Sequence, residues 1–309
     1  PGRYVDVYDC QIPGINRFDS QGFRVHNCGE IPFSMPAENC NLGHLNMAAF
    51  VNDKSGFLKA CRLMTRFLIR ATFADFTDPE ARKAIHTNRR IGVGLFGFHT
   101  WLVTQGIRFS ESHEKPEVRK FLRKAYEVIR KEARDYAFML RIPEPIKVTT
   151  CAPTGTIAKL PGETEGIQSV IAKYFIRRVN FSTSDPAQAV ALAEYEKKGY
   201  TIEDSAYTPN TKVVSFYVKD PIIDKVISAG YKEEIVEVAS EIDLEDMLAV
   251  QAMIQEEFAD NAISFTINFD KDKKRVGDLI RALKIFGPRL KGTTMMPTIS
   301  NRPQMPYEA

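Results

Sequence analysis

Helical and strand-like segments alternate along most of this 309-residue chain. Segment 115–141 carries apolar residues at helical spacing among many charges, whereas 212–218 and 261–269 are short and rich in β-branched and aromatic residues. This alternation predicts an α/β fold in which helices pack on a sheet. We expect helices over 57–73, 81–90, 115–141, 185–198, 232–258 and 275–286, and a further helix starting near Glu165. We expect strands over 212–218 and 261–269, and within 147–157 a strand that runs into a Thr/Gly turn.

Segment 88–97 contains the pattern G-x-G-x-x-G, from Gly92 to Gly97. A dinucleotide site requires a strand immediately before this pattern, and here a predicted helix precedes it. We therefore interpret 88–97 as helical, with glycines that allow close packing of helices rather than a cofactor site.

Composition narrows the class of protein. A hydrophobic content of 44% is enough for a large core, and the net charge of +3 is too small to indicate nucleic-acid binding. No run of about 18 apolar residues is present, so no membrane span is predicted. Five irregularly spaced cysteines favour a reducing cytoplasm, and no metal site is predicted. The first residues lack an initiator Met and a signal pattern, so we expect a fragment of a longer protein.

A thiol, a carboxyl group and a second thiol lie close together in the sequence at Cys28, Glu30 and Cys40. Sulfur can lose one electron or pair as a disulfide, so this combination suits radical or redox chemistry. The residues alone leave open a loop with two buried cysteines.

The wider sequence resembles a known family. CGEIPF…ENCNLGHLNM is similar to the ribonucleotide reductase segment NPCGE…CNLGxxNL, and APTGTI and the segment 172–179 resemble the same family, most closely its monomeric adenosylcobalamin-dependent triphosphate reductases. The resemblance implies that residues 28–309 are the C-terminal part of a ten-stranded α/β barrel with a finger loop. It also implies that 88–97 is a scaffold helix.

The same resemblance implies roles for individual residues. Cys28 would become a thiyl radical that abstracts the 3′ hydrogen of the ribose, and Glu30 would act as general base on the 3′ hydroxyl while the 2′ hydroxyl leaves as water. Cys40 would be one of two reducing thiols that end as a disulfide. The substrate phosphates would bind the turn formed by Ala152, Pro153, Thr154, Gly155 and Thr156.

The implied cofactor is adenosylcobalamin, whose cobalt–carbon bond breaks homolytically to start the radical chemistry. The implied partners are a ribonucleotide, a thioredoxin-like reductant and the N-terminal half of the enzyme. No direct contact with nucleic acid or membrane is expected.

Residues 1–27 resemble the C-terminal end of an intein. His26 and Asn27 precede Cys28 as at a C-terminal splice junction, where the Asn cyclises, the His assists and the Cys is the acceptor. Asp9 belongs to a second intein-like block, and the short strand-like runs predict a small β segment.

Two other functions stay open at this point. The chain could mainly be a self-splicing precursor fragment with no reductase activity of its own. It could also be a glycyl-radical enzyme, which shares the barrel and the finger-loop cysteine, although nothing before Ala309 resembles the glycyl-radical motif.

Overall fold

The computed structural model describes residues 18–20, 23–25, 29–270, 272–273, 275–297 and 307–308. Five segments run parallel through its centre. Strand β3 (Leu42–Asn46) pairs with β4 (Gly92–Phe96), and β8 (Thr266–Phe269) pairs with β9 (Thr294–Pro297). Segment 147–151 joins these two pairs, through bridges from Thr149 to Val93 and from Cys151 to Ile263.

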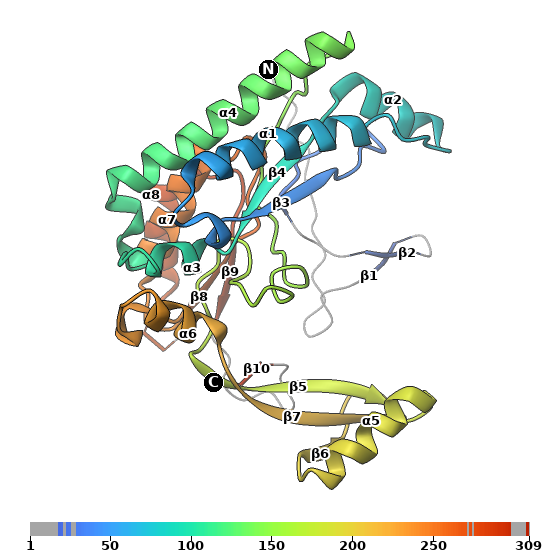
Figure 1. Cartoon of the computed structure of the whole chain (residues 1–309), viewed down its shortest axis with the longest axis vertical. Helices are drawn as coiled ribbons and strands as arrows, with labels where there is room; N and C mark the ends of the chain where they lie inside the picture. The colour runs from blue at the N-terminus through green and yellow to red at the C-terminus, as the bar shows by residue number, and fades with distance from the viewer. Residues whose placement is uncertain are drawn as a thin grey trace.

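The helices that connect these segments pack on one side of them (Figure 1). They are α1 (Lys54–Ala71), α4 (Pro116–Leu140), α7 (Leu244–Glu257) and α8 (Val276–Phe286). Their apolar faces and the strands form one continuous core, in which Phe57, Leu95 and Ile129 are among the fully buried side chains. Because this packing uses the helix side of the sheet, the opposite side is left for the loops that carry the site. Shorter helices α2 (Pro79–Asn88) and α3 (Phe98–Val103) flank β4.

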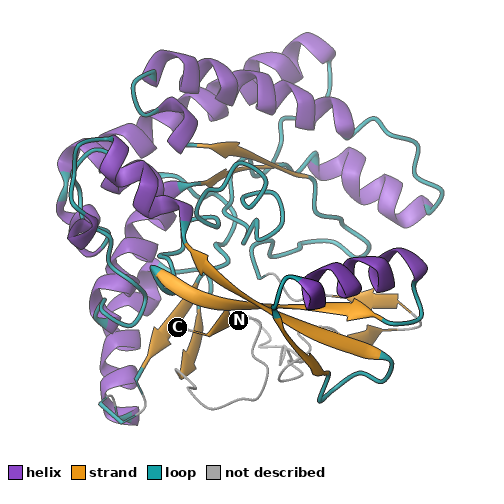
Figure 2. Cartoon of the chain, turned by 60° about the horizontal axis from the view of Figure 1, so that its bottom comes forward, coloured by secondary structure: helices purple, strands orange, loops and turns teal. Residues whose placement is uncertain are grey.

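A second sheet is antiparallel (Figure 2), and all of its strands except β10 come from the part of the chain between segment 147–151 and α7. Its strand order is β10-β5-β7-β6. The packing of α5 against β5 and β7 is aromatic, with the rings of Phe181, Tyr195 and Phe216 in edge contacts. Its elements are β5 (Tyr174–Ser182), α5 (Pro186–Lys197), β6 (Thr201–Asp204), β7 (Thr211–Lys219), α6 (Pro221–Ser228) and β10 (Tyr307–Glu308). Near the N-terminus, β1 (Phe18–Ser20) and β2 (Phe23–Val25) form a hairpin.

Most predicted helices are confirmed where amphipathic spacing and a capping residue agree. Asp78 caps α2 by accepting hydrogen bonds from the backbone N–H groups of Glu80 and Ala81, at 3.1 and 3.3 Å. The strand over 212–218 is confirmed as β7, whereas only the second half of 261–269 forms a regular strand, β8.

Three helix predictions are wrong. Segment 88–97 contains the buried strand β4, because its glycines make room for side chains of the neighbouring strands. A Cβ on Gly92 would lie 2.5 Å from Leu42 Cδ2, and one on Gly94 would lie 2.2 Å from His44 Nε2. The interpretation that these glycines allow close packing is therefore correct, but the elements that approach are strands.

The other two errors are local. Residues 232–258 are α-helical only from Leu244, after a short 3-10 turn at Glu233–Ile235. No helix starts near Glu165, because Gly166 has a φ of +45° and ends any helical run there. A Cβ at Gly166 would also lie 2.7 Å from the Ala152 carbonyl oxygen.

Candidate active site

Glu30 lies beside Thr150, near the end of strand segment 147–151. Its backbone oxygen accepts a 3.3 Å hydrogen bond from Thr150 Oγ1. Its side chain is 3% exposed, and the carboxyl atom Oε2 has no hydrogen-bond partner within the described residues. Burial raises the pKa of Glu30 above the ordinary value of 4.5. A buried carboxyl group of raised pKa with one unpartnered oxygen has the properties of a general acid or base.

The predicted phosphate-binding turn follows the same strand end directly. Thr154 has a φ of +55°, a strained conformation for a β-branched residue, and its Oγ1 accepts a 2.8 Å hydrogen bond from the Gly166 N–H. The backbone N–H groups of Thr154, Gly155 and Thr156 donate to no other described residue, and the last two residues are exposed. Unpaired backbone donors in such a turn can bind an anion without a lysine.

His44 connects strand β3 to this turn. Its Nε2 accepts a 3.0 Å hydrogen bond from the backbone N–H of Ala152, so the proton of the neutral ring is on Nδ1. Burial lowers the pKa of His44 to about 4. The ring is therefore neutral near pH 7 and fixes the first residue of the turn.

A cavity of about 410 Å³ opens beside the turn. Pro153, Lys159 and Glu165 line one part of it, and the last two form a 3.0 Å ion pair. The volume falls within the range of about 300–1,000 Å³ typical of small-molecule sites. The structure thus brings Glu30, the predicted phosphate turn and a cavity to one strand end.

Of the predicted redox cysteines and splicing residues, the structure describes only Cys40. Cys28, His26, Asn27 and Asp9 lie outside the described residues. Cys40 is exposed on segment 29–41.

Two further cysteines, Cys61 and Cys151, are fully buried. Cys61 packs in the core under α1, and Cys151 lies at the end of its strand segment. Burial raises the pKa of each thiol to about 12, and for Cys151 the nearby Glu30 charge adds to this effect. Thiols of such raised pKa are protonated at neutral pH and are therefore poor nucleophiles.

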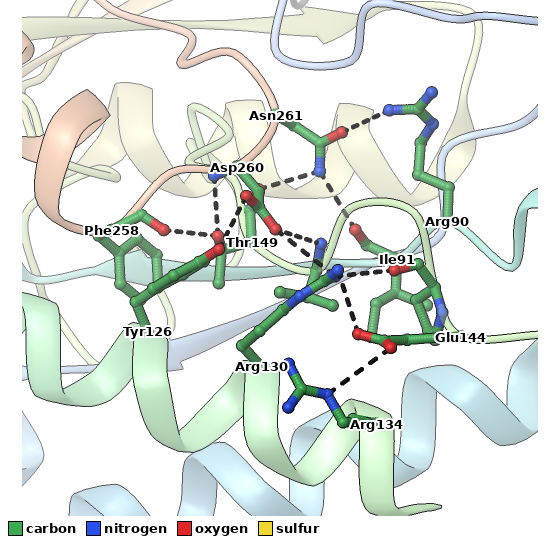
Figure 3. A network of polar contacts seen from close by, with 12 residues as sticks. Arg90, Ile91, Tyr126, Arg130, Arg134, Glu144, Thr149, Phe258, Asp260 and Asn261 are labelled. Atoms are coloured by element: carbon green, nitrogen blue, oxygen red, sulfur yellow. Dashed lines mark hydrogen bonds and ion pairs between the residues drawn. The ribbon is translucent and has the colours of Figure 1, made fainter. Parts of the chain in front are cut away.

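Sequence reasoning missed a buried polar network behind the site. Arg90 donates from Nε to Glu38 Oε1 at 2.6 Å and from Nη1 to Asn261 Oδ1 at 2.8 Å. The Asn261 side chain in turn donates to the backbone oxygens of Ile91 and Thr149 (Figure 3). These residues are up to 171 positions apart in sequence, so no local pattern could have revealed their contact.

The described part of the chain holds neither a membrane-spanning helix nor a cluster of metal ligands. No helix in the described part of the chain combines the length and apolar character needed to cross a membrane. Among the same residues, no three His, Cys, Asp or Glu side chains are grouped so that they could hold a metal ion.

The sequence matches the family model "Ribonucleotide reductase, barrel domain" over residues 25–140 and 146–295. A putative adenosylcobalamin-dependent ribonucleoside-triphosphate reductase of Mycobacterium phage D29 is 43% identical over 91% of this chain and 42% of its own length. An adenosylcobalamin-dependent ribonucleoside-triphosphate reductase of Lactobacillus delbrueckii subsp. bulgaricus is 32% identical over 96% of this chain and 40% of its own length. This chain therefore spans about two fifths of these relatives.

Solved structures agree with this match. The crystal structure of a B-12 dependent (class II) ribonucleotide reductase superposes with a TM-score of 0.75 at 30% identity, covering 91% of this chain and 40% of that one. The α subunit of an Actinobacillus ureae class Id ribonucleotide reductase gives a TM-score of 0.59 at 16% identity, covering 88% and 52%, and this likeness concerns the fold alone.

Proposed function

Because this chain belongs to the ribonucleotide reductase family and holds the α/β portion of its barrel domain, we propose that it supplies one half of a ribonucleoside-triphosphate reductase site. The observation that carries this proposal is the position of Glu30. Its buried carboxyl group, whose Oε2 has no partner among the described residues, lies at the same strand end as a turn with open backbone donors.

In the proposed reaction, the Cys28 sulfur radical takes the hydrogen atom from C3′ of the ribose. The Glu30 carboxylate accepts the proton of the 3′ hydroxyl, and the 2′ hydroxyl leaves as water. Two thiols, one of them Cys40, supply two electrons and two protons and become a disulfide; one proton leaves with the 2′ oxygen as water and the other goes to C2′. Glu30 returns its proton to the 3′ oxygen, and the C3′ hydrogen returns from Cys28. A thioredoxin-like dithiol would reduce that disulfide again.

The turn from Ala152 to Thr156 would bind the substrate phosphates through its backbone N–H groups. Glu165 forms an ion pair with Lys159, which offsets the negative charge on that side of the cavity.

We also propose adenosylcobalamin as the cofactor, because the cited relatives carry it in their names. The described residues do not fit it as a binding site of their own. His44 Nε2 accepts from Ala152, and the ring of His99 is fully buried with its Nδ1 accepting from the Val170 N–H. Both buried rings are therefore already engaged, and the cofactor would be held outside the described residues.

The test is reconstitution with the upstream part of the barrel. The joined protein should convert a ribonucleoside triphosphate to its 2′-deoxy product when adenosylcobalamin and a dithiol are added, and chromatography of the nucleosides measures this. Glu30→Gln should lower turnover by at least about 100-fold, in line with the loss of a general base. Full turnover in that variant would refute the proposed role of Glu30.

A second proposed function is protein splicing by residues 1–27. The His26–Asn27–Cys28 sequence supports it, as does the start of the family match at residue 25. Against it, the match to the Lactobacillus enzyme takes in 96% of the chain and hence part of 1–27. Intact-mass measurement decides: splicing chemistry predicts release of residues 1–27, which Asn27→Ala should abolish.

A further inference from the structure

Segment 29–41, which carries Glu30 and Cys40, has no helix or strand and little apolar packing. Its only two buried side chains are both acidic, Glu30 and Glu38. The one Phe of the segment, Phe33, is 50% exposed. A loop that buries so little apolar surface gains little from the hydrophobic effect, so polar contacts must hold it in place.

Glu38 makes those contacts with both carboxyl oxygens. Oε1 accepts from Arg90 Nε at 2.6 Å and from Asn88 Nδ2 at 3.0 Å. Oε2 accepts from the backbone N–H of Ser34 at 2.9 Å. Burial alone would raise the pKa of Glu38, but the hydrogen bonds from Arg90, Ser34 and Asn88 lower it below the ordinary value. The side chains of Glu38 and Arg90 are only 1% and 5% exposed, so the pair is shielded from salt and water.

Arg90 also connects the loop to the sheet. It precedes β4 directly, and its Nη1 donates to Asn261 Oδ1. Asn261 donates to the backbone oxygen of Thr149, in the strand segment that ends beside Glu30 (Figure 3). One continuous chain of hydrogen bonds therefore runs from Glu38, through the sheet, to the strand on which Glu30 rests.

We propose that Glu38 and Arg90 are positioning residues, which hold segment 29–41 so that the Glu30 carboxyl stays buried against the end of strand segment 147–151. The importance of that placement for catalysis rests on the proposed function, whereas the anchoring itself does not. Glu38 lies between Glu30 and Cys40 in the segment, so loss of its ion pair with Arg90 would release both of these residues.

The competing explanation is that the pair only adds to overall stability. Removing one partner of a buried ion pair is strongly destabilising in general. The two explanations differ in where the change appears. Anchoring predicts loosening confined to 29–41 and a changed environment of Glu30, while a general stability role predicts neither.

The first measurement is hydrogen–deuterium exchange of the intact chain, followed by mass spectrometry. In Glu38→Ala and in Arg90→Ala, amides of 29–41 should exchange roughly ten- to a hundredfold faster, with little change in α1 and α4. The double variant should add little to either single one, because both remove the same contact. Arg66→Ala is the matched control, since Arg66 and Glu132 form a 2.5 Å ion pair in which the arginine is 48% exposed.

The second measurement is the pKa of Glu30, followed by carboxyl carbon NMR and assigned with Glu30→Gln. In Glu38→Ala this pKa should fall back toward 4.5, because a released loop lets water reach the carboxyl group. Unchanged exchange in 29–41, an equal increase across α1 and α4, or an unmoved Glu30 pKa would each overturn the proposal.

Ser34→Ala provides a milder variant if Glu38→Ala does not fold. It removes only the hydroxyl that donates to Glu38 at 3.3 Å and accepts from Arg90 at 3.1 Å. The same local pattern should appear with smaller size, and its absence would count against anchoring. Neither readout uses reductase activity, so this proposal and the proposed function can fail separately.

Discussion

Glu30 and Glu38 lie eight residues apart in one loop and are both buried, yet their surroundings have opposite effects on them. Glu38 accepts hydrogen bonds at both carboxyl oxygens, and its pKa is lowered. Glu30 Oε2 has no partner among the described residues, and its pKa is raised. Two carboxyl groups with pKa values moved apart indicate a structural acid and a reactive one.

Glu30→Gln should stabilise the protein at neutral pH. A carboxyl group with a raised folded-state pKa favours folding fully below its unfolded value of 4.5, and this contribution is lost as pH rises through the folded value. Removing the charge should therefore raise the free energy of unfolding by about 1 kcal/mol at pH 7 to 8 and by less at pH 4. Urea unfolding across this pH range measures it, and equal effects at both ends would contradict the burial argument.

Glu38→Gln is expected to act in the opposite direction. Its lowered pKa gives stability that is present above 4.5 and lost as pH falls through the folded value. The substitution leaves Arg90 buried without its counter-charge, so it should lower the stability at pH 7, with a loss of up to roughly 3 kcal/mol concentrated in the local opening of segment 29–41. Urea unfolding of the two Gln variants side by side checks the contrast, and effects of the same sign would show that the loop environments are misassigned.

His44→Ala should loosen the predicted phosphate turn. Losing the acceptor for the Ala152 N–H removes about 1 kcal/mol, so exchange of that amide should be about fivefold faster. The lowered pKa of His44 also means that stability is full above 6.5 and is lost as pH falls toward about 4. His44→Gln should flatten this part of the stability curve, and a wild-type curve that already lacks the slope would refute the assignment.

Gly94→Ala tests the close contact between β3 and β4. The added Cβ would lie 2.2 Å from His44 Nε2, so the ring must move and the loss should be about 1–3 kcal/mol. Gly277→Ala in α8 is the matched control: no atom lies within 4 Å of its added Cβ, and helix propensity predicts a gain of up to about 1 kcal/mol. Thermal or urea unfolding of both variants measures the difference, and similar losses at both sites would contradict it.

Native alkylation should separate the three cysteines of the described region. Iodoacetamide should modify exposed Cys40 at least tenfold faster than Cys61 or Cys151, whose pKa of about 12 leaves almost no thiolate at pH 8. Peptide mass analysis after short exposure reports the order. Rapid labelling of Cys151 would show that the strand end opens in solution.

The sequence alone determined the helices that lie on the outside of the sheet and the identity of the reactive carboxyl candidate. Their amphipathic spacing and caps, such as Asp78 at the start of α2, are local and do not depend on partners far along the chain. Glu30 and the turn from Ala152 to Thr156 were likewise found from local strings.

Tertiary structure decided which conformation segment 88–97 adopts and which loop acid is paired. Gly92 and Gly94 lie in a strand because side chains from β3 occupy the space above them, and propensity cannot report such neighbours. Glu38 and Arg90 are 52 positions apart in the sequence, so they come into contact only when the chain folds. The protonation of a buried carboxyl group depends on which donors surround it in space, so its chemistry was settled only when distant strands came together.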